Sequence, residues 1–260
     1  MSLFDDAFVA LAGLLAGGVN AIAGGGTLIS FPALLATGTA AVTANITSSV
    51  GLVSGYLGGA VGYRRELAGQ RSRVLALGAS AVAGGLAGAV ILLVTPADSF
   101  RAVVPYLVLL SCFLLAVQPR TARWVAARVA ARAGDGRQQR EREIGPALQA
   151  GVFVASVYGS YFGAGLGVLL LAVLGILLQD ELQRLNGLKT VLAFVVNIVG
   201  VLVFLLSGRV AWVFALILLV TAYLGGILGA KVARRLSAST LRVAVIVLGV
   251  VVSIVLIVRG

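Results

Sequence analysis

The sequence has no histidine, a single cysteine and few acidic residues. Without histidine the chain lacks the commonest general base and metal ligand. Cys112 alone excludes an internal disulfide and argues against a thiolate metal site. The nine Asp and Glu residues all lie at the ends of apolar segments or in loops, so no buried carboxylate is available for a proton relay or as a counter-charge to a cation. We therefore expect no metal, no cofactor and no enzymatic activity.

Charged residues are also scarce, at 11%, whereas 60% of the residues are hydrophobic and the mean hydropathy is +1.09. A soluble domain carries about 25% charged residues, so this composition indicates a protein of the lipid bilayer. The net charge of +11 would indicate nucleic acid on a soluble protein. Here the arginines lie between apolar segments, where the positive-inside bias accounts for them. We therefore expect a multi-pass membrane protein with no nucleic-acid partner.

The two halves of the chain repeat each other. The run Ala83–Ala89 returns 141 positions later as Leu224–Ala230, and both contain Gly-Gly-x-x-Gly. The cluster Gly24–Gly26 matches Gly163–Gly165 at the nearby offset of 139. Two apolar halves with matching glycine interruptions are typical of secondary transporters.

Ten apolar segments are expected to form helices, five in each half. Their approximate bounds are 7–23, 27–37, 42–62, 73–95, 100–118, 147–162, 165–178, 186–206, 210–230 and 240–258. Segments 27–37 and 165–178 are too short to cross a hydrocarbon core of about 30 Å, and each follows a glycine cluster. Each half therefore begins with a glycine-broken helix or a re-entrant hairpin, followed by three transmembrane helices.

This pattern predicts an all-α integral membrane protein with two repeats, residues 1–118 and residues 147–260. A basic cytoplasmic linker, residues 119–146, joins them and includes a short interfacial helix around residues 124–132. An odd number of crossings in each repeat makes the second repeat inverted. That arrangement leaves all but four of the 20 Lys and Arg residues on the cytoplasmic side, whereas parallel repeats leave the basic cluster at 231–242 outside. The positive-inside rule favours inverted repeats with both termini outside.

The glycine clusters are the first candidates for a binding site. Three consecutive glycines leave backbone N–H groups uncovered, and Thr27 can cap the helix that follows. A helix N-terminus with free N–H groups and a positive dipole end suits an anion. Two inverted half-helices would direct both N-termini to one central site. The alternative, that these glycines only permit close helix packing, stays open.

Three polar residues can complete the cavity. Asn45 and Asn186 open equivalent helices, where they are either helix caps or ligands. Lys189 lies a turn inside a long apolar run, where an ammonium group costs several kcal/mol unless it is paired, hydrated or snorkelling. Its counterpart in the first half is Ser48, so the two sides of the site differ. The predicted substrate-binding residues are Gly24, Gly25, Gly26, Thr27, Asn45, Gly163, Gly165, Asn186 and Lys189.

Two further features are expected to be structural. Gly84 and Gly88, and their counterparts Gly225 and Gly229, have the GxxxG spacing of helix packing contacts. Asn197 lies in the middle of an apolar segment, where its amide is expected to join two helices.

An ordered set of motifs resembles one known family. The motifs are Ala23–Leu28, Phe31–Leu35, Ala44–Ser48, Gly62–Leu67 and Tyr161–Gly167. At these residues, and over about residues 8–258, the chain resembles the sulfite exporter TauE/SafE family, also described as domain of unknown function 81 permeases.

The resemblance implies a bacterial inner-membrane permease for small anions such as sulfite, sulfoacetate or thiosulfate. It also implies a site at Gly24–Thr27 and Gly163–Gly167. The second cluster departs from the family pattern, because it reads Gly-Ala-Gly-Leu-Gly and no proline matching Pro32 follows. Equal contributions from the two halves are therefore in doubt.

The functional prediction is a carrier that transports a small-molecule anion by alternating access. The alternative from another class is an accessory membrane protein that acts through its basic loop and transports nothing. The sequence leaves open which anion is carried, the direction of transport, the coupling ion, and whether the carrier is a monomer or a homodimer.

Overall fold

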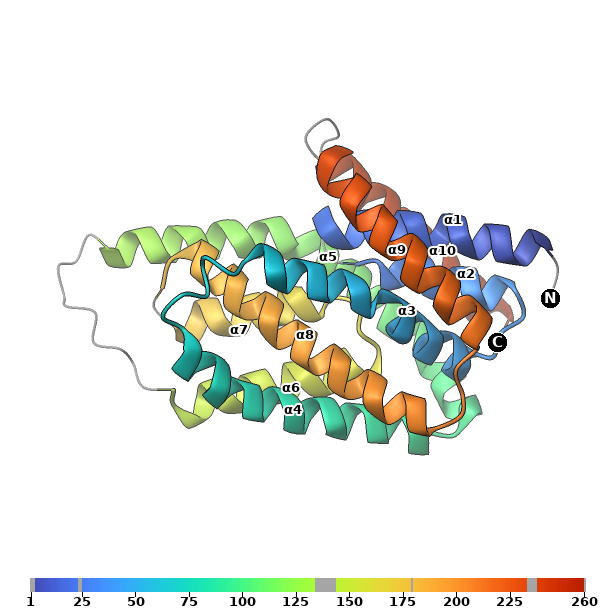
Figure 1. The fold of residues 1–260 in the computed structure, drawn as a ribbon, viewed down its shortest axis with the longest axis horizontal. Helices are drawn as coiled ribbons and strands as arrows, with labels where there is room; N and C mark the ends of the chain where they lie inside the picture. The colour runs from blue at the N-terminus through green and yellow to red at the C-terminus, as the bar shows by residue number, and fades with distance from the viewer. Residues whose placement is uncertain (1–2, 23–24, 134–143, 179, 233–237, 260) are drawn as a thin grey trace.

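The computed structural model describes residues 3–22, 25–133, 144–178, 180–232 and 238–259, and these form helices joined by short turns (Figure 1). The helices are α1 Leu3–Ile22, α2 Thr27–Ala36, α3 Ala41–Gly62, α4 Arg71–Val94, α5 Ala97–Ala133, α6 Pro146–Tyr161, α7 Leu166–Leu177, α8 Leu182–Leu206, α9 Trp212–Val232 and α10 Ala238–Arg259. Each of the ten predicted apolar segments corresponds to one of them. Helix α5 continues through Pro119 to Ala133 and so includes residues 124–132, for which the sequence predicts an interfacial helix.

The helix lengths and the outer surface fit a lipid environment. Within the described residues, four stretches are long and apolar enough to cross a membrane: Leu3–Asn20, Arg71–Val94, Ala97–Arg128 and Leu182–Leu206. Large aliphatic side chains face outward on several helices, among them Leu75 on α4, Leu216 on α9 and Val247 on α10, each more than half exposed. A soluble monomer rarely exposes so much apolar surface, because it would aggregate. The protein is therefore an all-helical integral membrane protein.

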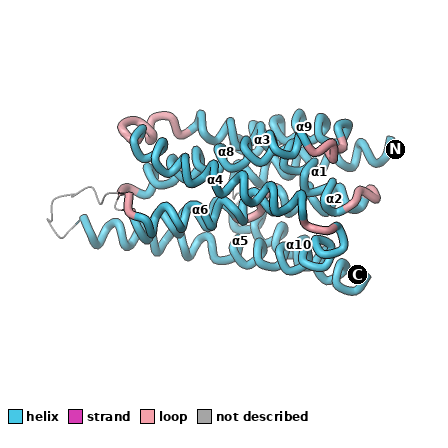
Figure 2. The backbone as a smooth tube through the Cα atoms, turned by 90° about the horizontal axis from the view of Figure 1, so that it is seen from below, coloured by secondary structure: helices cyan, strands magenta, loops and turns pink. Residues whose placement is uncertain are grey.

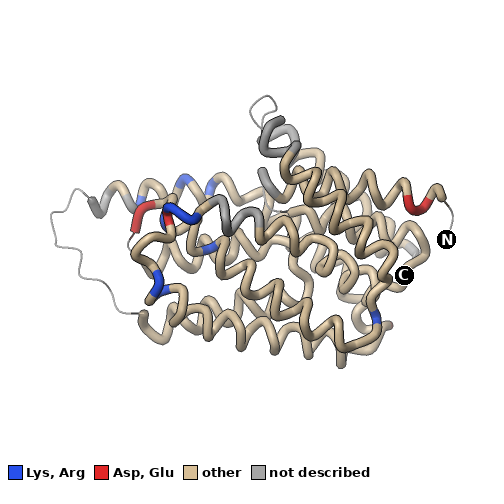
Figure 3. Tube along the Cα trace, in the orientation of Figure 1, with Lys and Arg blue, Asp and Glu red and all other residues tan. Residues whose placement is uncertain are grey.

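Most helices lie along the long axis of the molecule. The start of α1 and the end of α10 lie at one end, whereas α5 ends and α6 begins at the other (Figures 1 and 2). Lys and Arg residues gather at this second end, which we call the basic end (Figure 3). Helices α4 and α8 run parallel, as two contacts show. Arg73 pairs with Asp180 near the starts of both helices, and Arg209 donates to the Leu93 carbonyl (3.4 Å) near their ends.

Helices α3 and α8 cross antiparallel in the middle of the protein. The Tyr56 side chain on α3 lies close to the Asn197 side chain on α8. Further along, a Cβ at Gly187 would lie 3.6 Å from that of Tyr63, so the beginning of α8 meets the end of α3. The Asn197 amide also donates to the Ala193 carbonyl (2.8 Å). The closeness of Asn197 to Tyr56 agrees with the expectation that Asn197 joins two helices, while its hydrogen bond to Ala193 stays within α8.

The GxxxG glycines form very close helix contacts, and these contacts connect the two halves of the chain. A Cβ at Gly84 on α4 would lie 2.4 Å from the Phe153 carbonyl oxygen on α6, and one at Gly88 would lie 2.2 Å from that of Val157. A Cβ at Gly225 on α9 would lie 2.0 Å from the Leu14 carbonyl oxygen on α1. The packing role of Gly84, Gly88 and Gly225 is confirmed. The side-chain surroundings of Gly229 are not among those that the structure describes.

Helices α5 and α10 also pack on each other across the two halves. The Ser253 hydroxyl on α10 donates to the Pro105 carbonyl on α5 (2.8 Å). In the other direction, the Cys112 thiol on α5 lies 3.8 Å from the Ile246 carbonyl oxygen on α10. These side-chain to backbone contacts, together with the glycine contacts, fix the frame that holds the short helices α2 and α7.

Candidate functional site

The short helices α2 and α7 each fold back on the helix that precedes them. A Cβ at Gly26, just before α2, would lie 2.5 Å from the Ala16 carbonyl oxygen on α1. On the second hairpin, Gly151 of α6 lies against Val173 of α7, and Gly159 lies against Leu166 at the turn. Each half of the chain therefore contains a hairpin of two helices whose turn is the glycine cluster.

The two turns differ in backbone conformation. Gly163 and Gly165 adopt φ of 86° and 88°, in the left-handed region that favours glycine. Gly26 instead has right-handed helical angles, φ −55° and ψ −31°. Neither α2 nor α7 has a side-chain hydrogen bond from its N-cap residue, since both N-caps are glycines. Gly24 lies outside the described residues. The difference between the turns agrees with the departure of the second cluster from the pattern of the first.

The two turns meet in the middle of the protein. The Phe31 ring on α2 and the Phe162 ring at the second turn pack edge to face, with centroids 5.5 Å apart. A Cβ at Gly163 would lie 3.8 Å from the Thr27 Oγ1. The Asn45 amide on α3 donates to the Tyr161 carbonyl (2.9 Å) at the end of α6. The structure thus brings together three of the predicted residues, Thr27, Asn45 and Gly163.

Lys189 and Asn186 form a second group beside the same hairpin. The Lys189 ammonium donates to the Asn186 Oδ1 (3.1 Å). A Cβ at Gly167, in the first turn of α7, would lie 3.9 Å from the Lys189 Cδ. Lys189 is therefore placed next to the N-terminus of α7, where its charge adds to the positive end of the helix dipole. Among the described residues, the hydrogen bond and the glycine contact of Lys189 involve Asn186 and Gly167, and neither involves Thr27 or Asn45.

The position equivalent to Lys189 is neutral in the first half. Ser48 on α3 is fully buried, and its hydroxyl lies 2.6 Å from that of Ser30 on α2. Ser30 also donates to the Gly26 carbonyl (3.3 Å). The first hairpin is thus held by a pair of hydroxyl groups where the second has an ammonium group. The predicted difference between the two sides of the site is visible in these contacts.

The sequence prediction missed Ser111, which holds the second turn in place. The Ser111 hydroxyl on α5 donates to the Ala164 carbonyl (3.1 Å) and lies 2.9 Å from the Tyr158 hydroxyl. Tyr158 donates to the same carbonyl (2.8 Å). The available signal was a lone hydroxyl in the apolar run 107–117, since such a group needs a partner in the membrane.

Two buried polar atoms near the turns lack a hydrogen-bond partner among the described residues. They are the Oδ1 of Asn45, a residue with no exposed surface, and the Oγ of Ser160 on α6. Burying such atoms unpaired costs about 1–3 kcal/mol each. These atoms lie on α3, beside the Tyr161 carbonyl, and on α6, where the Ser160 hydroxyl faces Gly200 of α8. The described residues contain no group of three or more His, Cys, Asp or Glu side chains suited to a metal ion.

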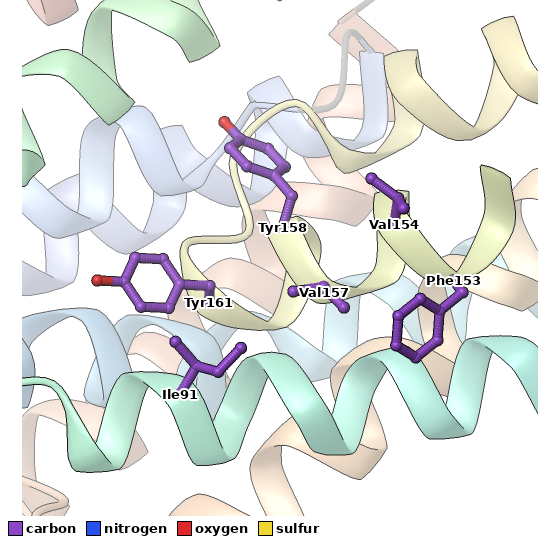
Figure 4. Close-up of a pocket in the computed structure, with 6 residues that line it drawn as sticks. All are labelled: Ile91, Phe153, Val154, Val157, Tyr158 and Tyr161. Carbon is purple, nitrogen blue, oxygen red and sulfur yellow. The ribbon is translucent and has the colours of Figure 1, made fainter. Parts of the chain in front are cut away.

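A separate groove lies on the outer face of α4 and α6 (Figure 4). It has a volume of about 440 Å³, and its lining is apolar. The residues that line it are Ile91, Phe153, Val154, Val157, Tyr158 and Tyr161. Val154 is two-thirds exposed, so this groove faces the surroundings of the protein and does not lie between the two glycine turns.

The paired hairpins and apolar surface define a multi-pass membrane protein with a polar centre, and the comparisons identify its family. Residues 9–256 match the sulfite exporter TauE/SafE family, and the chain belongs to this family. It is a multi-pass membrane transporter, and the resemblance found in the sequence motifs is confirmed. The alternative of an accessory protein is not favoured.

Relatives in several bacteria carry matching descriptions. Over 241 residues the chain is 27% identical to the probable membrane transporter protein YfcA of Escherichia coli K12, covering 92% of this chain and 85% of the relative. It is 25% identical to a probable membrane transporter protein of Haemophilus influenzae, covering 91% and 88%. It is 23% identical to the probable membrane transporter protein ORF9 of Sinorhizobium, covering 95% and 90%. No solved structure matches the chain.

Proposed function

We propose that this protein is a secondary carrier for small anions that works by alternating access around the two glycine turns. The observation that carries the proposal is the meeting of these turns, with Thr27 beside Gly163 and Phe31 against Phe162. Irregular backbone at membrane depth is tolerated only where it is buried in protein or lines a cavity. In broken-helix carriers it is also where substrate binds.

The donors around the turns favour an anionic substrate. Thr27 contributes a hydroxyl, the turn glycines contribute amides at the starts of α2 and α7, and Lys189 contributes the positive charge. The proposed binding residues remain Gly24, Gly25, Gly26, Thr27, Asn45, Gly163, Gly165, Asn186 and Lys189. The family's description as sulfite exporters makes sulfite and other sulfur-containing or organosulfonate anions the first candidates. We propose transport without an enzymatic step.

Contacts that repeat at a fixed offset support two structural repeats. Cys112 contacts Ile246, and Ser253 contacts Pro105. Ser253 is the counterpart of Cys112 at the offset of 141, and Pro105 is the counterpart of Ile246, so the second contact is the equivalent of the first. Such an exchange is expected when a two-fold pseudo-symmetry relates the halves, because each cross-repeat contact then occurs twice.

The central helix crossing indicates where that pseudo-axis lies. Tyr56 and Asn197 are counterparts at the same offset, yet their side chains lie close to each other. Two equivalent residues touch only when they lie close to the axis that relates them. Because α3 and α8 run antiparallel, the axis is perpendicular to these helices and lies in the membrane plane. This supports repeats that are inverted, with the units 1–118 and 147–260 joined by 119–146.

The basic end supports an orientation. Positive charge is retained on the cytoplasmic side, so we assign the basic end to the cytoplasm of a bacterial inner membrane. The hairpin α6–α7 then enters the membrane from the cytoplasmic side, and the hairpin α1–α2 enters it from the opposite side. Both ends of the chain also lie on that opposite side. The proposal needs only one copy of the chain.

The charge at Lys189 gives the direct test of this function. Substituting Lys189→Ala removes the one cationic donor beside Gly167, so transport should weaken while the protein stays folded. Hydrogen bonds to charged groups contribute about 1.5–3 kcal/mol. The half-saturation concentration for sulfite should therefore rise roughly tenfold or more. The measurement is counterflow in proteoliposomes loaded in turn with sulfite, thiosulfate, sulfoacetate or a dicarboxylate.

Two variants serve as controls for this experiment. Lys189→Arg keeps the charge and should retain most of the transport. Ser48→Ala changes the equivalent position of the first hairpin and should have the smaller effect. Unchanged counterflow in Lys189→Ala would remove the lysine from the site, and absence of exchange with every anion in the folded wild type would overturn the carrier itself.

A further inference from the structure

At the basic end, one carboxylate is held by two guanidinium groups and a backbone amide. Arg73 on α4 forms an ion pair with the Asp180 Oδ2. The Arg184 Nε on α8 donates to both oxygens of Asp180, at 2.9 and 3.1 Å. The backbone amide of Glu181 donates to the Oδ1 (2.8 Å). The Asp180 side chain is only 11% exposed, so this carboxylate is largely removed from water.

The same residues tie the start of α8 to the turn between α3 and α4. Arg184 donates to the Ala68 carbonyl (3.3 Å), and the Gln70 amide donates to the Arg184 carbonyl (3.1 Å). Gln70 is fully buried, and its amide also donates to the Glu66 carbonyl (2.9 Å). The cluster therefore joins the first half of the chain to the second across the basic end of the protein.

This cluster lies directly outside the proposed central site. Arg184 and Lys189 are five positions apart on α8, which corresponds to about 8 Å along the helix. Between them, Gly187 packs against side-chain atoms of Glu66 and Tyr63. The group formed by Arg73, Asp180 and Arg184 thus lies between Lys189 and the basic end along the axis of α8, which is the side from which we propose that an anion arrives.

The groups that hold Asp180, two guanidinium groups and a backbone amide, are hydrogen-bond donors of the kind that bind small oxyanions in proteins. Guanidinium groups match carboxylate and other oxyanions through charge-assisted hydrogen bonds. The Glu181 amide stands at the N-cap of α8, where the helix dipole favours negative charge. Asp180 itself is held by two guanidinium groups, while the carboxylates of Glu181 and Glu66 are the neighbouring negative charges. Asp180 therefore occupies the position of a small anion as a tethered competitor.

We propose that Arg73, Arg184 and the Glu181 amide form a second anion-binding site at the basic end, which the Asp180 carboxylate fills in this conformation. An arriving oxyanion displaces Asp180 and thereby breaks the ion pair between α4 and the start of α8. Anion binding at the basic end is thus coupled to loss of the ion pair between Arg73 and Asp180, which holds the two helices together at this end. The role of this site in transport rests on the proposed function, whereas its affinity for an oxyanion does not.

The test compares anion affinity in variants of the purified protein, with sulfite as the probe. Asp180→Asn removes the competitor and keeps the shape, so sulfite should raise the unfolding temperature at a concentration about fivefold lower than in the wild type. The double variant Asp180→Asn with Arg73→Gln should lose this gain. Arg209→Gln is the matched control, because Arg209 donates to the Leu93 carbonyl at the opposite end.

The outcomes separate this inference from the proposed function. If Asp180 were only a structural ion-pair partner, Asp180→Asn would lower the unfolding temperature without increasing the affinity for sulfite, and the inference would be overturned. The same gain in affinity in the double variant would also overturn it. Counterflow of the same variants is the second readout, in which Asp180→Asn should lower the half-saturation concentration by a similar factor. A wild type that exchanges no anion would refute the carrier but leave the affinity comparison valid.

Discussion

Gly84→Ala and Gly225→Ala are each expected to destabilise the protein strongly, whereas Gly78→Ala on the same helix as Gly84 should not. The added methyl group would lie 2.4 Å from the Phe153 carbonyl oxygen in the first variant and 2.0 Å from that of Leu14 in the second. A backbone carbonyl inside a helix cannot turn aside as the end of a side chain can, so the two helices have to separate.

The size of the effect follows from how tightly the interior is packed. Overpacking in a well-packed interior costs about 1–3 kcal/mol, and we expect the upper part of this range because backbone is displaced. At Gly78 an added Cβ meets nothing within 4 Å. There the gain in helix propensity, up to about 1 kcal/mol, should leave stability unchanged or slightly raised.

Unfolding in detergent micelles, followed by tryptophan fluorescence during heating, measures this difference. Gly84→Ala and Gly225→Ala should unfold at clearly lower temperatures than Gly78→Ala and the wild type. Similar losses in the first two variants are expected, because both glycines form the same kind of contact between halves of the chain. A Gly225→Ala variant as stable as Gly78→Ala would contradict the packing of α9 on α1.

The sequence predicted these glycines as packing contacts but did not predict their partners. Periodicity and spacing identify a face of small residues on α4 and on α9, and this is a local property of the chain. Which helix that face meets depends on the whole fold. In the structure α4 packs on α6 and α9 packs on α1, so each glycine face is used by the other half of the chain.

The candidate site shows the same limit of sequence-based prediction. The glycine breaks and polar residues were identified because both are rare within long apolar runs, and the structure brings Thr27, Asn45 and Gly163 together. Glycine permits both signs of φ, so the sequence could not specify that the second turn adopts left-handed angles. Asn186, Asp180 and Glu181 are the neighbours in the sequence that could satisfy Lys189, and in the structure Asn186 does so.

The asymmetry of the two hairpins has a consequence for a carrier. A fully symmetric protein would offer the substrate equivalent surroundings from both sides of the membrane. Here the second hairpin has an ammonium group at Lys189 and the first has the hydroxyl pair of Ser30 and Ser48. An anion should therefore be held more strongly by the second hairpin. The two hairpins would then exert unequal control over its release.

Gly163→Ala is expected to reduce transport by about tenfold or more while costing about as much stability as Gly38→Ala, a substitution at another glycine with positive φ. Gly163 has a φ of 86°, so alanine there carries about 1–2 kcal/mol of backbone strain. The added methyl group has space, because its nearest neighbours are the Gly159 carbonyl oxygen at 3.5 Å and the Thr27 Oγ1 at 3.8 Å. It would stand in the gap between the two turns, where we propose that the anion binds.

Gly38→Ala is the matched control for this prediction. Gly38 follows α2 with a φ of 81°, and an added Cβ there meets nothing within 4 Å. Both variants thus carry the same kind of strain, but only Gly163→Ala places a methyl group between the turns. Counterflow and heating of the two variants side by side separate the effects. Equal transport by both at equal stability would mean that the space beside Gly163 and Thr27 does not hold the substrate, and the binding site would have to be sought around Lys189 alone.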